Sequence, residues 1–230
     1  MHAMRISIDV YSDPVCPWCF IGKRRLGRAL SSRPDLEANV QWRAFQLNPA
    51  IPENGLERDA YLVSKFGSAE EANRLYEHIR TVGLRERIEF NFDDIHRTPS
   101  TIAAHLLIRF ASERGKSDQA VEALFQAFFI HGKDIGQESE LAAIAINCGL
   151  DADEFSQYAE DADAIDQVQN EDMVGRRIGI DGVPYFIIDG KYALSGAQEP
   201  EAFHNIFDMV IENERNTRKQ QRAEVSPANL

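Results

Sequence analysis

The chain has 230 residues, and its 37 acidic side chains outnumber its 25 basic ones, which gives a formal charge of −12. Its 43% hydrophobic and 27% charged residues are ordinary for a globular protein, and three cysteines are too few for a disulfide scaffold. The acidic balance argues against general binding to nucleic acid or anionic membranes, and no stretch approaches the roughly 18 uncharged apolar residues of a membrane span.

The N-terminal part of the chain predicts a strand, a helix and a second strand. Residues 5–11 alternate between apolar and polar side chains, which is the period-two pattern of a strand. Residues 17–30 show helical periodicity, and Pro17 suits the first helical position, where its missing N–H is not needed. Residues 39–46 alternate again. This order indicates two parallel strands joined by a right-handed crossover.

The middle of the chain, from residue 57 to residue 178, predicts a helical block. Apolar residues recur there at helical spacing, and the alternation typical of strands is absent. Gly149 follows one of these periodic stretches, and we expect it to end that helix as a C-cap. The predicted helices span residues 101–114, 117–130, 138–148, 151–159 and 162–178.

Strand patterns return near the C-terminus. Residues 184–188 lead into an Asp-Gly pair that is typical of a type I′ hairpin, and residues 191–194 form the returning strand. A final helix is predicted over residues 199–213. Residues 215–230 contain almost no apolar side chains, so we expect a mobile tail there.

A Cys-Pro-Trp-Cys segment falls between the first predicted strand and its helix. Cys16 would stand at the helix N-terminus, where unpaired N–H groups and the helix dipole favour the thiolate, the form that attacks disulfides. Two intervening residues place Cys19 one turn further into the helix, where it can reach Cys16 and close a disulfide. The pattern therefore predicts that Cys16 forms mixed disulfides and that Cys19 resolves them.

Two other interpretations of this pair remain open. A Cys-x-x-Cys segment can be half of a zinc site, but such a site needs two more cysteine or histidine ligands at matching spacing, and the chain has no second pair. We therefore predict no metal site. The two cysteines can also be buried structural residues. Their position between a strand and a helix favours the redox pair.

Several segments resemble the DsbA family of thioredoxin-fold oxidoreductases, and in particular its FrnE-like branch. The resemblance covers roughly residues 5–212. It implies an α/β thioredoxin fold, of order β-α-β and then β-β-α, interrupted by a large all-helical insertion. The similar segments are Asp13–Phe20, Leu124–Phe129, Gly149–Asp151, Gly179–Phe186 and Ser195–Gln198.

The resemblance also sets the expected domain organisation. Residues 1–56 and 179–214 would form a discontinuous thioredoxin-like domain, and residues 57–178 an inserted helical domain. The tail from residue 215 to residue 230 would lie outside both.

The family implies roles for four residues around the cysteines. Pro184 would be a cis proline that faces the disulfide, so that the backbone of Val183 can pair with an extended substrate. A trans proline that begins an edge strand is the alternative. Pro17 and Trp18 would tune the reduction potential through the local hydrogen bonds of the thiolate. The alternative for Trp18 is a surface aromatic residue near a substrate groove.

Other positions depart from the related enzymes or have a structural interpretation. Several thioredoxin-fold enzymes carry a buried acid six residues before the first cysteine, and Val10 occupies that place here. Any proton acceptor would have to come from elsewhere, and we interpret the nearby Asp13 as a turn residue. His105 is a candidate catalytic residue, although a packed, hydrogen-bonded histidine is the favoured interpretation. Cys148 is interpreted as a small buried hydrophobe.

The predicted function is that of an enzyme that exchanges disulfides of polypeptides or small molecules through Cys16 and Cys19. No bound cofactor is expected, and glutathione is a candidate co-substrate. No nucleic-acid or membrane partner is expected, and the sequence does not indicate an oligomeric state. The N-terminus shows no basic segment followed by an apolar one, so we expect a cytoplasmic protein.

Two other functions fit the same sequence. Kappa-class glutathione transferases and hydroxychromene carboxylate isomerases share this fold and its helical insertion, but they use a single Ser or Cys to activate glutathione. The presence of Cys19 argues against that function. A holdase-like binding module would instead use the groove beside the cysteines, with the helical insertion covering apolar clients.

Overall fold

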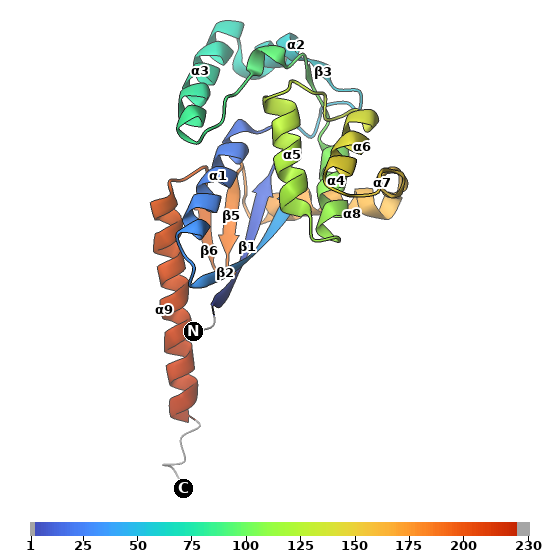
Figure 1. Cartoon of the computed structure of the whole chain (residues 1–230). Coiled ribbons are helices and arrows are strands. Elements are labelled where there is room, and N and C mark those ends of the chain that lie inside the picture. The colour runs from blue at the N-terminus through green and yellow to red at the C-terminus, as the bar shows by residue number, and fades with distance from the viewer. Residues whose placement is uncertain (1–2, 225–230) are drawn as a thin grey trace.

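The computed structural model describes residues 3–224 and contains a four-stranded mixed sheet with helices packed around it (Figure 1). The strand order is β2-β1-β5-β6, with β1 parallel to β2 and antiparallel to β5, and β5 antiparallel to β6. This order confirms the predicted strand–helix–strand beginning and strand–strand–helix end of the fold. The strands are β1 (Met4–Ser12), β2 (Leu36–Ala44), β5 (Tyr185–Ile188) and β6 (Tyr192–Ser195).

The alternating residues of β1 place it at the centre of the sheet. Ile8 and Val10 are at most 1% exposed, because they point into the core from a strand that has neighbours on both sides. Val10 lies opposite Trp42 of β2 and Phe186 of β5. The predicted hairpin between β5 and β6 also forms, with both residues of the Asp-Gly pair at positive φ, as a type I′ turn requires.

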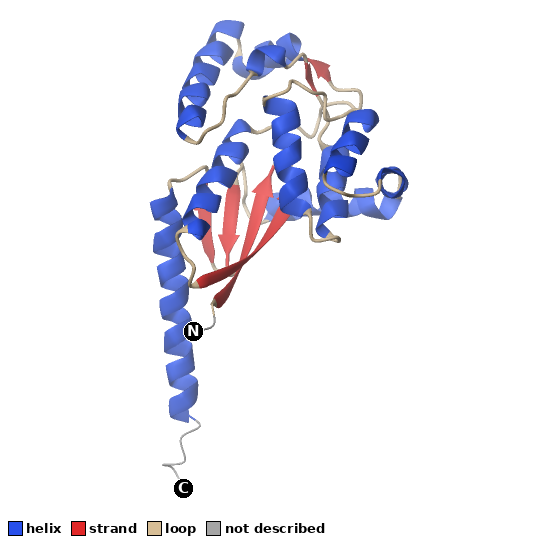
Figure 2. Cartoon of the chain, in the orientation of Figure 1, coloured by secondary structure: helices blue, strands red, loops and turns tan. Residues whose placement is uncertain are grey.

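Two helices lie side by side next to this sheet: α1 (Pro17–Ser31) and α9 (Pro200–Glu224) (Figure 1). The tail prediction is wrong for residues 215–224, because α9 continues through them and its last turns extend past the sheet (Figure 2). Good helix formers such as Arg, Lys, Gln and Glu dominate this stretch and sustain a helix without an apolar face. Residues 225–230 of the predicted tail lie outside the described residues.

The segment between β2 and β5 carries seven α-helices in the described structure. The five helices predicted from residue 101 onward are confirmed to within two residues at each end, whereas two helices between residues 57 and 86 were not assigned. The segment also contains a two-residue antiparallel pair, so it is not purely helical. Among the described residues, no helix is long and apolar enough to cross a membrane. The elements are β3 (Leu56–Glu57), α2 (Arg58–Phe66), α3 (Ala69–Arg85), η1 (Phe92–Asp94), β4 (Arg97–Thr98), α4 (Ile102–Ser112), α5 (Ser117–Phe129), α6 (Glu138–Asn147), α7 (Ala152–Ala159) and α8 (Ala162–Arg177).

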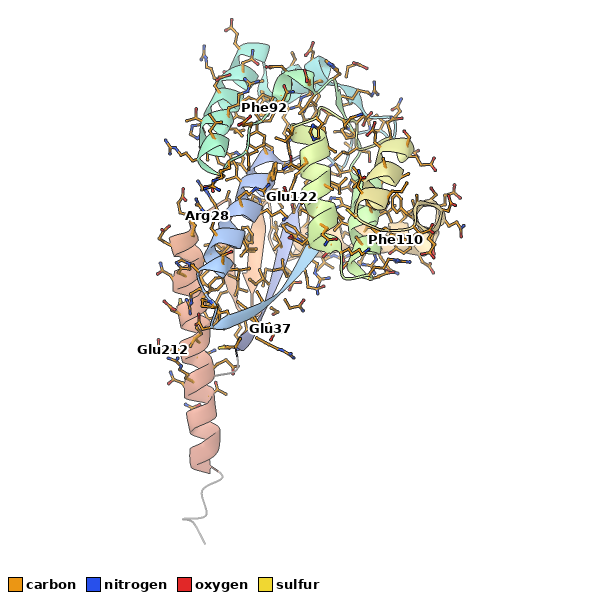
Figure 3. All side chains as sticks on the ribbon, in the orientation of Figure 1. Arg28, Glu37, Phe92, Phe110, Glu122 and Glu212 are labelled. Atoms are coloured by element: carbon orange, nitrogen blue, oxygen red, sulfur yellow. The ribbon has the colours of Figure 1, made fainter. Side chains whose placement is uncertain are left out.

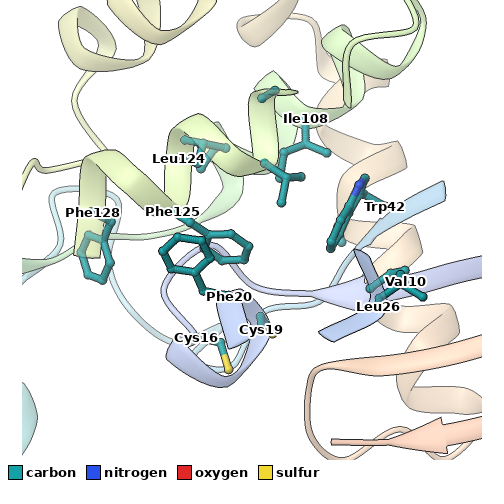
Figure 4. Packing of buried hydrophobic residues seen from close by; sticks show 14 of the residues in the cluster. Val10, Cys16, Cys19, Phe20, Leu26, Trp42, Ile108, Leu124, Phe125 and Phe128 are labelled. Atoms are coloured by element: carbon teal, nitrogen blue, oxygen red, sulfur yellow. The ribbon is translucent and has the colours of Figure 1, made fainter. Parts of the chain in front are cut away.

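One hydrophobic core runs from the sheet into this helical segment. Phe20 of α1 stacks on Phe125 of α5 (Figure 4), with ring centroids 4.9 Å apart. It also meets Phe90 edge to face, with ring centroids 6.0 Å apart. Such aromatic pairs add to the free energy gained from area burial alone. The helix that begins at the cysteines is therefore held partly by the insertion. The division into domains at residues 57 and 178 stays a prediction.

A buried ion-pair network fixes α1 to the residue that follows α3. The carboxylate of Glu86, whose side chain is 2% exposed, accepts a hydrogen bond from Arg25 Nε at 2.8 Å and one from Arg28 at 3.2 Å. Arg25 also donates to the backbone oxygen of Ala197 at 2.6 Å. Arg28 is marked on α1, on the side near α9 (Figure 3). This network ties together three segments that are distant in sequence.

We predict that Glu86→Gln lowers the free energy of unfolding by about 2–3 kcal/mol, because it leaves the buried Arg25 with only the more exposed Glu199, 2.6 Å away, as a counter-charge. Urea denaturation followed by circular dichroism measures this change. Glu37→Gln is the matched control, because Glu37 (labelled in Figure 3) makes an exposed ion pair with Arg5. Its free energy of unfolding should fall by less than about 1 kcal/mol. If the free energy of unfolding falls equally in the two variants, the buried network does not stabilise the fold more than an exposed ion pair does.

Candidate functional site

The Cys-Pro-Trp-Cys segment forms the first turn of α1. Cys16 is the N-cap residue, with the extended backbone angles φ −96° and ψ 112°, and Pro17 follows as the first helical residue. The N–H of Cys19 donates to the backbone oxygen of Cys16 at 3.0 Å, which closes the first turn. Both cysteines are free thiols, and they are 4% and 1% exposed respectively (Figure 4). The sequence therefore brings the two sulfur atoms together at the start of one helix.

The backbone of Val183 and Pro184 faces the first thiol. Cys16 Sγ donates a hydrogen bond to the backbone oxygen of Val183 at 3.4 Å, and the Val183–Pro184 peptide bond is cis. Gly22, one turn further along α1, allows this approach: a Cβ there would lie 2.9 Å from Pro184 Cγ and 3.3 Å from Phe186. A glycine at this position is required by close packing of the helix on β5, since any side chain would push the two elements apart.

The second thiol is held in its protonated form. Burial raises the pKa of Cys19 well above its usual range, and the hydrogen bond with Cys16 acts in the same direction. The hydroxyl of Ser12 and the backbone N–H of Asp13 oppose this shift, because both donate toward the sulfur. Cys19 is thus neutral at physiological pH, and two donors are already in place to stabilise a thiolate when one forms.

Asp13 proves to be more than a turn residue. Its carboxylate accepts the N–H of Val15 at 3.3 Å, which is the predicted turn contact, and also the N–H of Leu47 at 2.7 Å. The residue is 1% exposed. Burial raises its pKa to about 6, although hydrogen bonds from Leu47, Val15 and the Thr101 hydroxyl favour the charged form. The site therefore holds a carboxyl that titrates near neutrality.

Side chains of α2 and α3 also lie near the cysteines and Trp18. Lys65 Nζ donates to Asn48 Oδ1 at 2.6 Å and lies 5.4 Å from the centre of the Tyr61 ring. Desolvation lowers the pKa of Lys65, and its electrostatic attraction to Asp13 and Cys16 opposes that change. The Trp18 ring lies 6.0 Å from the ring of His78 on α3. Lys65 and Tyr61 both interact electrostatically with Cys16, so a cation and an aromatic ring lie in the surroundings of the first thiol.

The structure brings together six of the seven residues singled out from the sequence: Cys16, Pro17, Trp18, Cys19, Val183 and Pro184. His105 lies elsewhere, on α4, in a cavity whose lining includes neither thiol. It is 3% exposed, and burial lowers its pKa to about 4, while a hydrogen bond to the Phe45 backbone opposes the shift. This agrees with the packed, hydrogen-bonded interpretation.

Cys148 differs from its sequence interpretation. It is the C-cap residue of α6 and only half-buried, since the helix ends at the surface rather than in the core. Burial still raises the pKa of its thiol. Within the part of the chain that the structure describes, no group of three or more His, Cys, Asp or Glu side chains is arranged to hold a metal ion.

The residues that sequence reasoning missed come mainly from α2 and α3. Lys65 and Tyr61 lie on α2, which has no strong apolar run to mark it. A signal for α3 was present: Ser68 is followed three residues later by Glu71, and the Ser68 hydroxyl accepts the Glu71 N–H at 3.2 Å. No comparable pattern marks the burial of Asp13, which only the packed structure shows.

Comparison with known proteins decides the family. A model described as the DSBA-like thioredoxin domain matches residues 7–208. The chain belongs to this family. The match confirms both the family resemblance and the α/β thioredoxin fold with its helical insertion.

Three similar proteins span nearly the whole of this DSBA-like chain. The uncharacterized protein YwbO of Bacillus subtilis (strain 168) is 29% identical over 213 residues, which are 92% of this chain and 98% of the relative. The probable DsbA oxidoreductase SCO1869 from Streptomyces coelicolor is 27% identical, with a TM-score of 0.81 over 98% of this chain and 93% of that one. The cytosolic disulfide reductase DsbM from Pseudomonas aeruginosa, solved with GSH, shares the fold at 14% identity, with a TM-score of 0.63 over 90% and 99% of the two chains.

We predict that the stability of the wild-type protein falls relative to Asp13→Asn as the pH rises from about 4 to about 7. In the folded chain the Asp13 carboxyl keeps its proton up to about pH 6, whereas its ordinary pKa is 3.8. Within this window the folded chain still binds a proton that the unfolded chain has already lost. As the pH rises, the folded state loses this advantage, and the free energy of unfolding falls by roughly 1–3 kcal/mol. The Asn variant lacks this ionisation.

Urea denaturation of both proteins at a series of pH values measures the difference. Because all other groups are shared, their titration cancels in the comparison. The difference in the free energy of unfolding between the wild type and Asp13→Asn should therefore shift against the wild type as the pH rises. If it stays constant, or shifts in favour of the wild type, the folded state does not raise the pKa of Asp13.

Proposed function

We propose that this protein is a thiol–disulfide oxidoreductase that works through Cys16 and Cys19. The observation that carries the proposal is the placement of the Cys16 thiol at the N-cap of α1, 3.4 Å from the backbone oxygen of Val183, with Cys19 one turn behind it. A thiol at a helix N-terminus forms its thiolate more readily, and a second thiol within reach can resolve a mixed disulfide.

The exchange follows from this arrangement. The Cys16 thiolate attacks one sulfur of a substrate disulfide, the substrate S–S bond breaks, and the other substrate sulfur leaves as a thiolate. Cys19 then loses its proton and attacks the Cys16 sulfur. The new bond is the Cys16–Cys19 disulfide, and the remaining substrate sulfur leaves as a thiolate. The reverse sequence oxidises a substrate dithiol, with the two electrons passing to the Cys16–Cys19 pair.

The surroundings of Cys19 suit the second step. Its raised pKa keeps it protonated, so that it does not compete with Cys16 for the substrate disulfide. The Ser12 hydroxyl and the Asp13 N–H then stabilise the thiolate that must form before Cys19 attacks. Val10, opposite Phe186 in the sheet, provides no acid at the place where related enzymes carry one.

Polypeptide and small-molecule disulfides are the proposed substrates, and the cytoplasm is the proposed setting. An extended peptide would pair with the backbone of Val183 beside Pro184, with Trp18 next to it. Lys65 provides a positive charge near Cys16 that suits the carboxylates of glutathione. The GSH in the DsbM structure, together with this charge, supports glutathione as a co-substrate.

We predict that Cys16→Ser reduces insulin reduction by dithiothreitol to the uncatalysed rate, because the hydroxyl cannot form the mixed disulfide. The turbidity of the precipitating insulin chains measures the reaction. Cys148→Ser is the matched control and should keep the wild-type rate, since Cys148 caps the end of α6, outside the site. Equal activity of Cys16→Ser and wild type would refute the proposed function.

We predict that Lys65→Gln slows reaction with oxidised glutathione by up to about fivefold, the range expected for one exposed charge pair. The rate with uncharged bis(2-hydroxyethyl) disulfide should change little. Stopped-flow measurement of the intrinsic tryptophan fluorescence of the reduced protein follows both reactions. Lys191→Gln serves as the charge-matched control, since Lys191 lies in the hairpin between β5 and β6. Equal slowing on both disulfides would show that Lys65 does not select for anionic substrates.

A further inference from the structure

A cavity of about 420 Å³ lies within the helical segment between β2 and β5, and its lining includes neither thiol. Its walls come mainly from α2, α3 and η1: Arg58 begins α2, Tyr76 lies on α3, and Phe92 begins η1. Small-molecule sites in proteins commonly measure roughly 300–1,000 Å³. The cavity is therefore large enough for a small organic molecule.

Arg58 is buried at this cavity without a counter-charge. Its side chain donates from Nη1 to Thr98 Oγ1 at 3.1 Å and from Nη2 to the Tyr76 hydroxyl at 2.5 Å. The guanidinium carbon also lies 5.4 Å from the centre of the Tyr76 ring and 5.6 Å from that of Tyr61. These partners are all uncharged, and within the described part of the chain Arg58 forms no ion pair. Because an arginine that is 8% exposed stays charged, a missing counter-charge is costly and indicates an anionic occupant.

The Arg58 guanidinium keeps N–H groups that the protein does not use. It has five N–H groups, and the hydrogen bonds to Thr98 and Tyr76 use one on Nη1 and one on Nη2. Nε has no hydrogen-bond partner among the described residues, yet it is not one of their five unpaired side-chain atoms that are fully enclosed. Nε therefore retains accessible surface. Because Arg58 lines the cavity, its Nε–H and a free Nη–H are available to a molecule inside.

The acidic side chains at this cavity do not supply the missing counter-charge. Glu57 pairs with Arg97, and an oxygen of Asp93 lies 2.8 Å from Arg80 Nη2. Asp59 is exposed and forms no ion pair in the described structure, so water solvates its carboxylate. The buried guanidinium therefore remains the charge that a ligand in the cavity can neutralise.

Apolar side chains complete the lining. Leu62 of α2 and Ile95 after η1 contribute aliphatic surface. Phe92, which is labelled in Figure 3, stacks on Tyr76 with ring centroids 4.3 Å apart. The cavity thus combines one buried cation with aliphatic and aromatic walls, and this combination fits an anion that carries an apolar body better than an inorganic ion.

We propose that this cavity binds a small organic carboxylic acid in its ionised form. The carboxylate would accept from Arg58 Nε–H and a free Nη–H as a bidentate pair, and the apolar body would lie against Leu62 and Phe92. Water in the cavity can accept the same N–H groups, but it supplies no negative charge. The inference does not depend on the redox chemistry at Cys16 and Cys19.

The test is a ¹⁹F NMR titration of the full chain with two ligands of the same shape, 4-fluorobenzoate and 4-fluorobenzamide. Both present the same apolar ring, but only the benzoate carries a negative charge. We expect 4-fluorobenzoate to bind saturably and 4-fluorobenzamide to bind at least about tenfold more weakly, because the amide leaves Arg58 without a counter-charge. Equal affinity for the two ligands, or no saturable binding of the benzoate, would overturn the proposal.

Two variants of α2 locate the binding. Arg58→Gln and Lys65→Gln each remove one positive charge from this helix, but only Arg58 lines the cavity. Arg58→Gln should weaken the binding of 4-fluorobenzoate at least about tenfold, to the level of the benzamide, whereas Lys65→Gln should keep the wild-type affinity. If Lys65→Gln weakens the binding and Arg58→Gln does not, the carboxylate binds beside Cys16 and the proposal is wrong.

Leu62→Glu tests the same site without removing the buried cation. Leu62 is half-buried at the cavity and follows Arg58 by four residues, so the introduced carboxylate lies one helical turn away and competes for the guanidinium. Binding of 4-fluorobenzoate should be lost, and circular dichroism reports whether each variant is folded. Unchanged binding in folded Leu62→Glu would show that the benzoate binds outside the cavity, which also overturns the proposal.

Discussion

The close approach of α1 to β5 is the constraint on which the candidate site depends. Gly22 allows it, because a Cβ at that position would meet Pro184 at 2.9 Å. With the helix this near to the strand, Cys16 Sγ reaches the backbone oxygen of Val183 at 3.4 Å. The aromatic contacts of Phe20 with Phe90 and Phe125 hold the other side of the helix. The position of the first thiol is thus set by packing on both sides, not by the Cys-x-x-Cys spacing alone.

Burial has opposite consequences for catalysis and for folding at this site. It keeps Cys19 protonated and raises the pKa of Asp13 to about 6, so the buried site holds a neutral thiol and a carboxyl that ionises only as the pH approaches neutrality. Each also has N–H or hydroxyl donors directed at it, which lowers the cost of ionisation. The site can therefore pass through charged forms without exposing its groups to solvent, although the ionised Asp13 reduces the stability of the fold.

The sequence patterns that predicted the structure best are those with a local physical cause. The alternation in β1, the Asp-Gly turn before Lys191 and the glycine after α6 each specify a backbone conformation within a few residues. By contrast, α2 and α3 have weakly apolar sequences and owe their position to contacts with distant segments, such as that of Glu86 with Arg25. The candidate site shows the same contrast between features with a local cause and features that depend on distant segments. The spacing of Cys16 and Cys19 indicated a redox pair, whereas the burial of Asp13 depends on the N–H of Leu47, which lies on a different segment.

The hydrogen bond between Cys16 and Val183 joins residues that are 167 positions apart, and this separation matters during synthesis. At about 5–20 residues per second, the ribosome makes the second of these residues roughly 8 to 33 s after the first. During that interval β1 has no β5 beside it, and the two thiols emerge without the backbone that faces them in the finished fold. The nascent chain thus exposes its most reactive side chains well before it can complete the site that contains them.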